Sequence, residues 1–435
     1  MESITIIGAG LAGCEAAWQI ARRGGKVILY EMKPKVYSSA HRSPFFAELV
    51  CSNSFKSESL ENASGVLKEE LGRLESLVLK VAKEARVPAG DSLAVDREVF
   101  SKQITHILES LDNARVIREE VSFIPQGRIT IIATGPLTSE ALSKEIQKMT
   151  GNRHLFFYDA ISPIVVADSI DFQHAFKSSR YGKGGEDYVN CPMNEEAYDQ
   201  FVQALNQAER VPIRPFEKRY LFEGCLPVEE MAERGRETLA FGPLKPVGLI
   251  DPKTGKQPFA VVQLRQEDRF KTLFNLVGFQ TRLKHEEQKR VFRMIPGLEK
   301  AEFVRLGSIH RNTFIDSPRL LGESLQLKAL PNLFFAGQIT GVEGYMESTA
   351  MGLLSGINAH RYANRLPILI PPRTTTIGAL VHYITHSLTV PFQPMNINFG
   401  LFPPLPGKNR GRQKRLLFAE RALRDLAEWK IKNEI

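Results

Sequence analysis

Three glycines and one carboxylate near the N-terminus have the types and spacing that bind a dinucleotide. The glycine segment reads G-x-G-x-x-G, and Glu31 follows it at the end of the next expected strand. In such a turn the glycines permit a sharp bend, close approach of a pyrophosphate and tight helix–strand packing. The acid would accept from ribose hydroxyls, which favours FAD or NAD over NADP without separating FAD from NAD. The residues of the turn are Gly8, Ala9, Gly10, Leu11, Ala12 and Gly13.

The elements that must position this turn are present in the required order. Residues 3–7 form a β-branched apolar run, typical of a buried parallel strand. We expect a helix from about Leu11 to Arg23, ended by Gly24 and Gly25, and a second strand over residues 26–30. The helix N-terminus offers free N–H groups and partial positive charge to phosphates. We therefore interpret the segment as a dinucleotide-binding unit rather than a glycine-rich turn without a ligand.

Two later segments are expected to join the same sheet. Residues 128–135 and 332–337 read as buried strands that end in small residues. The helix expected after the second strand is also rich in small residues, which suits either close approach to a ring system or close helix–sheet packing. Many flavoproteins with two dinucleotide folds carry A-T-G after such a strand, and this similarity implies a place near FAD. The expected cofactor-lining residues here are Ala133, Thr134, Gly135, Gly337, Gly341 and Gly344.

Four cysteines occur without a C-x-x-C pair, so neither a disulfide framework nor a zinc site is expected. A reducing cytoplasm fits this cysteine usage. Cys14 lies on the expected buried side of the first helix, and we interpret it and Cys191 as structural. Cys51 and Cys225 fall on expected loops, where a thiol could be exposed and reactive, although most free cysteines are inert.

Composition is that of an ordinary globular protein, with 435 residues, 43% hydrophobic and 24% charged. There is no run of 18 apolar residues and no signal-peptide pattern at the N-terminus, so no membrane association is expected. The net charge of +8 permits a polyanionic partner without requiring one. The densest positive cluster fits either a solvated helix face or RNA phosphate contact, and consists of Lys408, Arg410, Arg412, Lys414 and Arg415.

The fold class that these patterns predict is α/β. We expect an FAD-binding, Rossmann-like domain of the two-dinucleotide-fold flavoprotein type, interrupted by a mixed α/β insertion domain. The first part of the FAD-binding domain would span residues 1–150, and the insertion domain, which contains Cys225, would span residues 151–304. The second part of the FAD-binding domain would span residues 305–370. A C-terminal segment with a basic helix from about Gly411 would span residues 371–435. Within the first part, residues 32–60 read as an irregular loop of functional length. Residues 61–84 and 96–112 read as amphipathic helices, the second opening at Asp96.

With its two cysteine loops, the whole pattern resembles one family, the folate- and FAD-dependent tRNA uracil-5-methyltransferases (TrmFO). The resemblance covers nearly the whole chain, and the cysteine motifs are more specific than the glycine motif. The N-terminal matching segments are GAGLAG (8–13), YEMKP (30–34), FAELVCSNSFKS (46–57), VPAGDSLAVDREVFS (87–101), IIATGPLTS (131–139), FYDAISPIV (157–165) and SRYGKGGEDYVNCPMN (179–194). Those that follow are FEGCLPVEEMAERG (222–235), FGPLKPVGL (241–249), VVQLRQED (261–268), NLVGFQTRLKHEEQKRVFRMIPGLE (275–299), HRNTFIDSP (310–318) and FFAGQITGVEGYMES (334–348). More distantly, the chain is similar to the wobble-uridine flavoprotein GidA (MnmG).

The resemblance implies methylation of C5 of the T-loop uridine in tRNA, in the cytoplasm. Methylenetetrahydrofolate would supply the carbon, reduced FAD would carry it at N5 and complete the methyl, and NAD(P)H would regenerate the flavin. By the same resemblance Cys51 and Cys225 are the catalytic cysteines. Cys225 would add to C6 so that C5 becomes nucleophilic, and Cys51 would protect the flavin-bound carbon or handle protons. The target base would flip out of its loop. No metal is expected, and the oligomeric state cannot be read.

Three alternatives remain beside this interpretation. The first is the same chemistry on a ribosomal RNA uridine, because local motifs do not distinguish the two RNAs. The second is an RNA-binding flavoprotein that does not methylate, which the two intact cysteine motifs argue against. The third is a plain NAD(P)H oxidase, which would need neither cysteine loop. No second G-x-G-x-x-G marks a nicotinamide site, and the choice between NADPH and NADH stays open.

Overall fold

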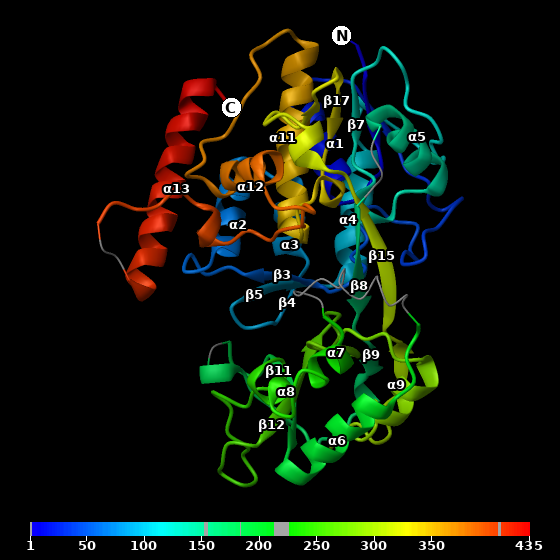
Figure 1. Cartoon of the computed structure of the whole chain (residues 1–435), viewed down its shortest axis with the longest axis vertical. Coiled ribbons are helices and arrows are strands. Elements are labelled where there is room, and N and C mark those ends of the chain that lie inside the picture. The colour runs from blue at the N-terminus through cyan, green and yellow to red at the C-terminus, as the bar shows by residue number, and fades with distance from the viewer. Residues whose placement is uncertain (1, 152–154, 183, 213–225, 408–409) are drawn as a thin grey trace.

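The computed structural model describes residues 2–151, 155–182, 184–212, 226–407 and 410–435. Figure 1 shows an upper lobe that contains both ends of the chain and a smaller lower lobe built from the middle of the sequence. A long antiparallel pair, β8 (Leu155–Ile161) and β15 (Ser308–Phe314), runs between the two lobes. Within these described residues, no helix combines the length and apolarity needed to span a bilayer.

The upper lobe is organised around a six-stranded sheet in the order β16-β17-β7-β1-β2-β6. Five of its strands are parallel, and only β16 runs against its neighbour. This order confirms the predicted Rossmann-like α/β fold, in which a crossover connection returns the chain to pair beside β1. The strands are β1 (Ile4–Ile7), β2 (Val27–Tyr30), β6 (Ala114–Ile117), β7 (Thr130–Ile132), β16 (Gln326–Leu327) and β17 (Leu330–Phe335).

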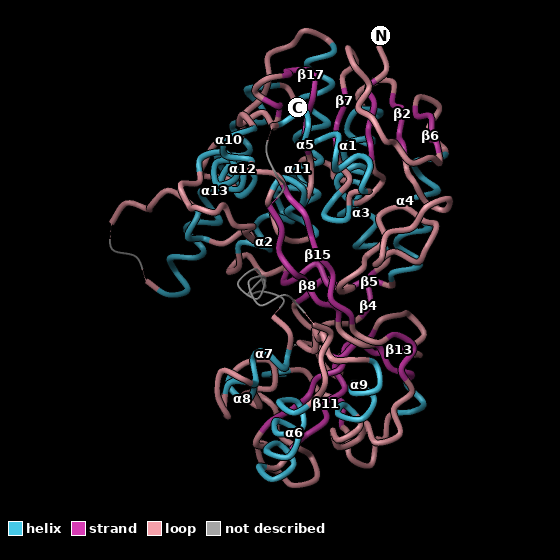
Figure 2. Tube along the Cα trace, turned by 45° about the vertical axis from the view of Figure 1, so that its right-hand side comes forward, coloured by secondary structure: helices cyan, strands magenta, loops and turns pink. Residues whose placement is uncertain are grey.

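The two strands expected from the later segments join this sheet as predicted. Thr130 of β7 is paired with Thr5 of β1 on one side and with Leu333 of β17 on the other. Strand β17 therefore returns to the sheet from beyond the lower lobe, because the chain between β7 and β17 passes through that lobe (Figure 2). Both strands are shorter or shifted by one or two residues relative to the expected ranges, a displacement common at element ends.

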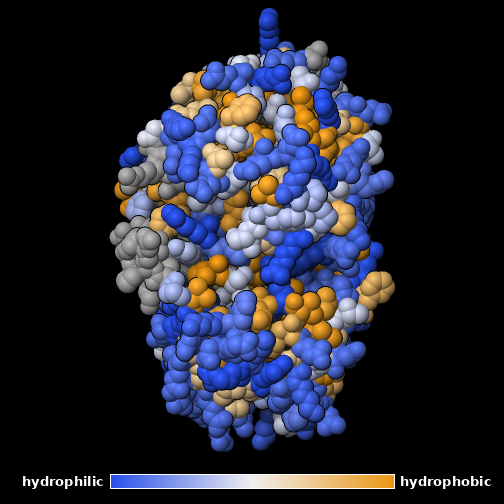
Figure 3. Space-filling model, turned by 90° about the vertical axis from the view of Figure 1, so that its right-hand side faces the viewer, coloured by the Kyte–Doolittle hydropathy of each residue, from blue (hydrophilic) through white to orange (hydrophobic). Residues whose placement is uncertain are grey.

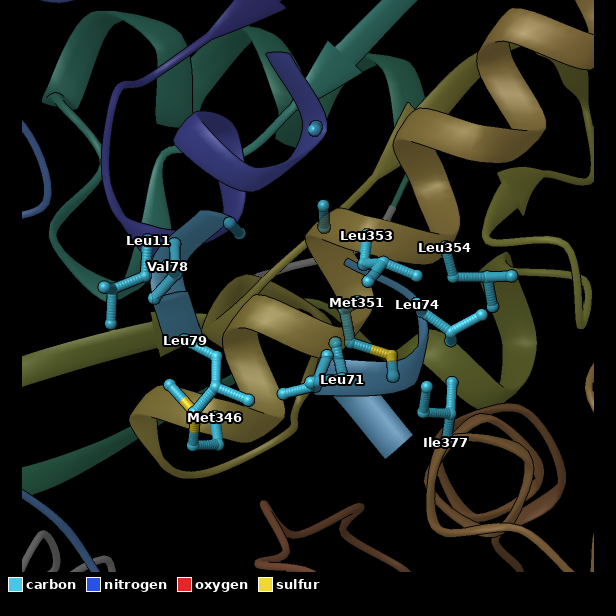
Figure 4. Packing of buried hydrophobic residues seen from close by; sticks show 14 of the residues in the cluster. Leu11, Leu71, Leu74, Val78, Leu79, Met346, Met351, Leu353, Leu354 and Ile377 are labelled. Atoms are coloured by element: carbon cyan, nitrogen blue, oxygen red, sulfur yellow. The ribbon is translucent and has the colours of Figure 1, made fainter. Parts of the chain in front are cut away.

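The principal hydrophobic core lies where α1 (Leu11–Ala21) crosses α11 (Tyr345–Ala363). A Cβ on Gly352 would overlap the backbone of Ala12, and one on Gly356 would lie 2.8 Å from Ala16 Cα. These two α11 glycines therefore serve close packing of one helix on another, whereas the sequence suggested close approach to a ring system or to a sheet. Leucine and methionine side chains of α2, α3 and α11 fill the adjoining space in Figure 4.

One expected helix is wrong, because residues 61–84 form two helices, α2 (Ala63–Arg73) and α3 (Leu77–Glu84). Between them Glu75 adopts a positive φ of 57°, and the Ser76 side chain accepts from the N–H of Leu79 as the N-cap of α3. The Ser76 cap stabilises the break between α2 and α3, although the helical period of apolar residues continues across that break. Asp96 caps α4 (Arg97–Glu109) as expected, accepting from the N–H groups of Glu98 and Val99.

The expectation of an irregular segment over residues 32–60 also needs correction. Residues 54–57 form β3 (Ser54–Ser57), which pairs with β5 (Ser92–Val95) in a small sheet completed by β4 (Arg86–Val87). The polar sequence hides this strand because only Phe55 among its side chains is buried. Figure 1 shows the small sheet at the boundary between the two lobes.

The lower lobe contains a second six-stranded sheet, antiparallel throughout, in the order β10-β11-β12-β13-β9-β14. Its apolar face packs against α6 (Glu195–Gln207) and α9 (His285–Phe292). Short helices α7 (Val228–Ala232) and α8 (Thr238–Phe241) border it. The strands are β9 (Ile164–Val166), β10 (Phe176–Lys177), β11 (Tyr188–Met193), β12 (Ala260–Gln266), β13 (Leu273–Leu276) and β14 (Phe303–Arg305).

Four further helices complete the upper lobe. Helix α5 (Glu140–Thr150) lies beside the parallel sheet, and α10 (Ser317–Leu320) packs on α12 (Thr376–His386). Helix α13 (Gly411–Asn433), which begins where the sequence predicts, packs along α2 on the outside of the molecule. The face of the molecule shown in Figure 3 is mostly hydrophilic, with apolar patches on its upper part and across its middle.

Candidate functional site

An open cavity lies at the carboxyl ends of β1, β2, β7 and β17, where ligands bind in parallel α/β sheets. The space, including open solvent at its mouth, is about 1070 Å³. Most of the residues predicted to hold the cofactor line it, so the structure brings segments from both ends of the chain together. Those residues are Gly8, Ala9, Gly10, Leu11, Ala12, Glu31, Ala133, Thr134, Gly135 and Gly337.

The three motif glycines occupy different surroundings. Gly8 has a φ of 99°, and a Cβ on it would lie 2.7 Å from the carbonyl oxygen of Ala133. A Cβ on Gly13 would overlap the carbonyl oxygen of Gly8, which is the close packing that the motif predicts. No described protein atom lies within 4 Å of the Cβ position of Gly10, the N-cap of α1. The space in front of Gly10 is therefore open at a helix N-terminus, as a pyrophosphate requires.

Glu31 is buried at the cavity wall, and its carboxylate is fixed by two backbone donors. Its Oε2 accepts from the N–H of Ala9 at 3.0 Å, and its Oε1 accepts from the N–H of Lys33 at 3.0 Å. Each carboxylate oxygen retains acceptor capacity, so the group can also accept from ribose hydroxyls. The open space at Gly10, the N-terminus of α1 and the fixed Glu31 carboxylate together fit a dinucleotide such as FAD. Contact of individual residues with that dinucleotide stays a prediction.

Three of the predicted cofactor residues do not line this cavity in the described structure. Gly13 packs against Gly8, a Cβ on Gly341 would overlap the ring of Phe392, and one on Gly344 would overlap the carboxylate of Glu347. Gly344 is the N-cap of α11, and the next residue, Tyr345, does line the cavity. Contact of Gly341 and Gly344 with the cofactor stays a prediction.

Cys51 lies in the loop before β3, next to Val50 at the cavity wall. Its N–H donates to the Tyr345 hydroxyl oxygen at 3.0 Å, and the N–H of Ser52 donates to the same oxygen at 3.1 Å. Cys51 is half-buried, with its Sγ 3.8 Å from the carbonyl oxygen of Ala160. The first of the two predicted reactive cysteines therefore lies beside the candidate cofactor site and is not fully buried.

Side chains of the lower lobe hold the Cys51 loop in place. Arg265 of β12 donates to the Ser52 hydroxyl and to the Asn53 side-chain oxygen, both at 2.8 Å. Burial lowers the pKa of this guanidinium, whose hydrogen bonds here go to neutral groups. Asn53 in turn donates to the carbonyl oxygens of Val95 and Gln266. The loop therefore depends on both lobes for its shape.

A second arginine, Arg97 at the start of α4, supports the same loop. It donates to the carbonyl oxygen of Leu49 at 2.6 Å and binds both oxygens of Glu267, at 2.6 and 3.1 Å. Burial acts to lower the pKa of Arg97, but Glu267 outweighs it and the pKa lies above its usual range. Sequence reasoning assigned no role to Arg97, Arg265 or Tyr345, although all three lie in segments that resemble the family.

Four basic side chains interact electrostatically with one another, and one of them, His41, lines the cavity. The group consists of Arg42, Arg305, His41 and His310. Burial, with Arg97 and Arg42 nearby, lowers the pKa of Arg305. Burial and the charges of Arg305, His41 and Arg42 lower the pKa of His310 to about 4, so its imidazole is neutral at pH 7. Two guanidinium groups beside a neutral ring favour an anionic ligand with an aromatic part.

Two predicted site residues, Cys225 and Lys408, lie outside the described residues. Cys14 and Cys191 are fully buried, and burial raises the pKa of each thiol. Both are therefore inert at neutral pH, in agreement with their structural interpretation.

The remaining basic residues of the predicted RNA-binding cluster lie at the exposed start of α13. Arg412 donates to Glu61 at 2.7 Å, and Arg415 lies 3.8 Å from the same carboxylate. Lys414 lies over the ring of Phe418, 5.7 Å from its centroid. Exposed pairs of this kind are weak and compete poorly with a phosphate, so RNA contact by this cluster stays a prediction.

Known proteins resemble this chain over nearly its full length. The family model described as "Glucose inhibited division protein A" matches residues 3–367. A protein of Geobacter sulfurreducens named methylenetetrahydrofolate–tRNA-(uracil-5-)-methyltransferase TrmFO is 60% identical over 428 residues, 98% of each chain. A Desulforamulus reducens protein of the same name is 58% identical over 433 residues, 99% of this chain and 98% of its own. Among solved structures, Aquifex aeolicus GidA aligns with 99% of this chain and 73% of its own, at a TM-score of 0.72 and 17% identity.

Proposed function

The chain belongs to the TrmFO family of methylenetetrahydrofolate–tRNA-(uracil-5-)-methyltransferases, and we propose that it methylates C5 of the T-loop uridine in tRNA with FAD bound in the cavity and NAD(P)H as reductant. The observation that carries this proposal is the position of the half-buried Cys51, which follows Val50 of the cavity wall and is hydrogen-bonded to Tyr345, another residue that lines this dinucleotide-sized cavity. The finer elements, namely the T-loop target, the reductant and the cytoplasmic location, rest on the family resemblance.

The cavity residues would hold FAD in an orientation that leaves its ring system near Cys51. Gly10 would face the pyrophosphate at the start of α1, and Glu31 would accept from a ribose. Val50 and Tyr345 also line the cavity, and the flavin ring would lie against them. When bound, FAD supplies the electrons and carries the one-carbon unit that completes the methyl group.

We assign the covalent step to Cys225 and proton handling to Cys51. The Cys225 thiolate would add to C6 of the uracil, which makes C5 nucleophilic toward the one-carbon unit. After the carbon is attached, the C5 proton must leave before the S–C6 bond can break and release the product. Tyr345, Arg97 and Arg265 would keep the Cys51 loop in a fixed position for this chemistry.

The basic group formed by Arg42, Arg305, His41 and His310 would bind the anionic co-substrate. Methylenetetrahydrofolate carries carboxylates on its glutamate tail and a flat pteridine, and the group offers guanidinium donors beside a neutral imidazole. Because Arg97 and Tyr345, which hold the Cys51 loop, also act electrostatically on Arg305, a folate held by this group would lie on the side of the site that carries Cys51. RNA would then approach across the open mouth, assisted by the basic start of α13.

The test is a methylation assay with the flavin-loaded protein, unmodified tRNA, labelled methylenetetrahydrofolate and either NADPH or NADH, without S-adenosylmethionine. The proposal expects label at C5 of the T-loop uridine. Label only in a ribosomal RNA transcript would shift the substrate assignment. A reducible flavin with no label in either RNA would instead indicate a flavoprotein that does not methylate.

A further inference from the structure

Three potential metal ligands meet on the outside of the upper lobe, away from the cavity. Glu323, His382 and His386 bring one ligand atom each to within 4.8 Å of one another. The two imidazoles project from successive turns of α12, with ring centroids 4.4 Å apart, and Glu323 lies between α10 and β16. The Nδ1 atoms of both histidines are 3.8 Å from the same oxygen of Glu323.

The hydrogen bonding of this group is incomplete. Nδ1 of His382 is buried and has no hydrogen-bond partner among the described residues. A buried polar atom without a partner destabilises the folded protein, so such atoms are rare unless something else satisfies them. Nδ1 of His386 has only the hydroxyl of Thr385, at 2.9 Å. An imidazole nitrogen that is buried, unpaired and close to a carboxylate is placed as a metal ligand would be.

The electrostatic setting favours a cation at this point. His386 is the last residue of α12, where the helix dipole places partial negative charge, and the Glu323 carboxylate adds a full one. Arg373 opposes it, but its side chain is exposed and therefore screened.

We propose that Glu323, His382 and His386 form a binding site for a divalent transition-metal ion of the zinc class, with water completing the coordination. Two imidazoles and one carboxylate are a ligand set that zinc accepts in four-coordinate sites. The cysteine pattern predicts no zinc site, because the chain has no C-x-x-C pair. The available signal was a pair of histidines four residues apart on a helix, which places both on one face.

The site would stabilise a segment that covers the start of α11. Directly after His386 the chain continues into residues 387–398. There the Phe392 ring packs on Gly341, and the carbonyl oxygen of Met395 accepts from the N–H of Glu343 at 2.9 Å. A metal that joins the end of α12 to Glu323 would fix the start of this segment. The role is structural, since none of the three ligands lines the cavity.

The experiment uses the metal-depleted, flavin-loaded protein and Zn²⁺ as the probe, with affinity measured by equilibrium dialysis and coordination by X-ray absorption. The expected result is one Zn²⁺ per chain bound by two imidazole nitrogens and carboxylate or water oxygens at about 2.0–2.2 Å. Glu323→Gln, His382→Gln and His386→Gln should each weaken binding more than about 100-fold, because each removes a ligand. His106→Gln, at an exposed helical histidine, is the matched control and should bind as the wild type does.

Equal Zn²⁺ affinity in the ligand variants and the control would overturn the proposal, because the binding would then be adventitious. Glu323→Gln keeps the shape of the side chain, so its circular dichroism and flavin content should match those of the wild type even if a histidine variant folds poorly. Arg373→Gln provides an opposite change. It removes the opposing charge and should tighten Zn²⁺ binding at low ionic strength, where screening is weak. A weaker affinity under those conditions would contradict the placement of the metal.

Discussion

Tyr345 at the start of α11 and Cys51 in the loop before β3 are joined by a hydrogen bond across most of the chain. The phenolic oxygen accepts from the N–H of Cys51 at 3.0 Å and from that of Ser52 at 3.1 Å. Burial and the neighbouring Cys51 raise the pKa of Tyr345 above its usual range, so the hydroxyl stays protonated. One side chain therefore fixes the cysteine loop relative to the cavity.

Replacing Tyr345 with Phe should separate the positioning of the Cys51 loop from the binding of the flavin. The ring that lines the cavity remains, but two backbone N–H groups lose their acceptor, which costs about 1–3 kcal/mol in loop order. We expect methyl transfer to fall roughly 5- to 100-fold, with flavin affinity changed less than about twofold. Tyr383→Phe, which removes a hydroxyl that donates to the carbonyl oxygen of Gln393, is the control and should leave methyl transfer intact. A Tyr345→Phe enzyme with normal turnover would exclude the positioning role.

Gly10 and Gly13 should respond to alanine in opposite ways. The Gly10 Cβ position is free of described atoms and its φ is −74°, so Gly10→Ala should fold with nearly unchanged stability. Its methyl group would occupy the space of the pyrophosphate, and we expect flavin affinity to fall more than about tenfold. Gly13→Ala would overlap the carbonyl oxygen of Gly8 and should destabilise the apoprotein as well. Thermal unfolding of the apoproteins and flavin titration measure the two effects separately, and full flavin affinity in Gly10→Ala would contradict the proposed pyrophosphate position.

Glu70 should make stability depend on pH. Burial raises its pKa from 4.5 to about 7, although its carboxylate accepts from the Thr376 N–H at 2.7 Å and from the Ile377 N–H at 3.1 Å. Because the folded pKa is the higher one, the stabilisation is complete below pH 4.5 and is lost as pH rises through 7. The loss is about 3 kcal/mol.

The measurement is the difference in unfolding free energy between the wild type and Glu70→Gln at a series of pH values. Other buried carboxyl groups, such as Glu15 and Glu229, titrate in both proteins and cancel from the difference. The relative stability of the wild type should decline from pH 4.5 to 7.5. A flat difference curve would mean that Glu70 ionises in the folded protein as it does in the unfolded chain.

The two cysteines should be distinguishable by trapping with RNA that contains 5-fluorouracil in the T-loop. Cys225→Ala should abolish the covalent complex, because the thiolate that adds to C6 is missing. Cys51→Ala should still form the complex but turn over slowly, since its assigned role is proton handling. Denaturing gels report the complex, and Cys191→Ala, at a buried cysteine, is the control. Persistent trapping by Cys225→Ala would transfer the nucleophile to another residue.

The sequence predicted the parts of the fold that local patterns determine. The glycine turn, the buried strands around it and the cap at Asp96 each depend on neighbouring residues, and the structure has them in the expected places. Prediction from the sequence was wrong where a tertiary contact overrides the hydrophobic period of a segment. Ser76 interrupts an apolar period that looks continuous, because its hydroxyl caps α3 and donates to the buried carboxylate of Glu15.

In the candidate site, too, the residues with a local sequence pattern could be predicted and those that depend on tertiary contacts could not. The residues of three glycine-containing segments that line the cavity could be predicted because each segment carries its own signal. Arg265 and Tyr345 could not, since their contacts with the Cys51 loop join residues more than two hundred positions apart in the chain. Burial of an arginine whose hydrogen bonds go to neutral side chains appears only when the two lobes are seen together.

The basic start of α13 should contribute to RNA affinity through charge alone. Neutralising Arg410, Arg412, Lys414 and Arg415 together should weaken tRNA binding and lower the slope of log Kd against log salt by up to about 3, since each phosphate contact contributes about 0.7–0.9. Glu61→Gln offers the opposite change, because it releases Arg412 and Arg415 from their shared carboxylate. That variant should bind tRNA about two- to fivefold more tightly at low salt, an effect that disappears at high salt. Binding titrations at several salt concentrations measure both variants, and an unchanged slope in the fourfold variant would place the RNA on another surface.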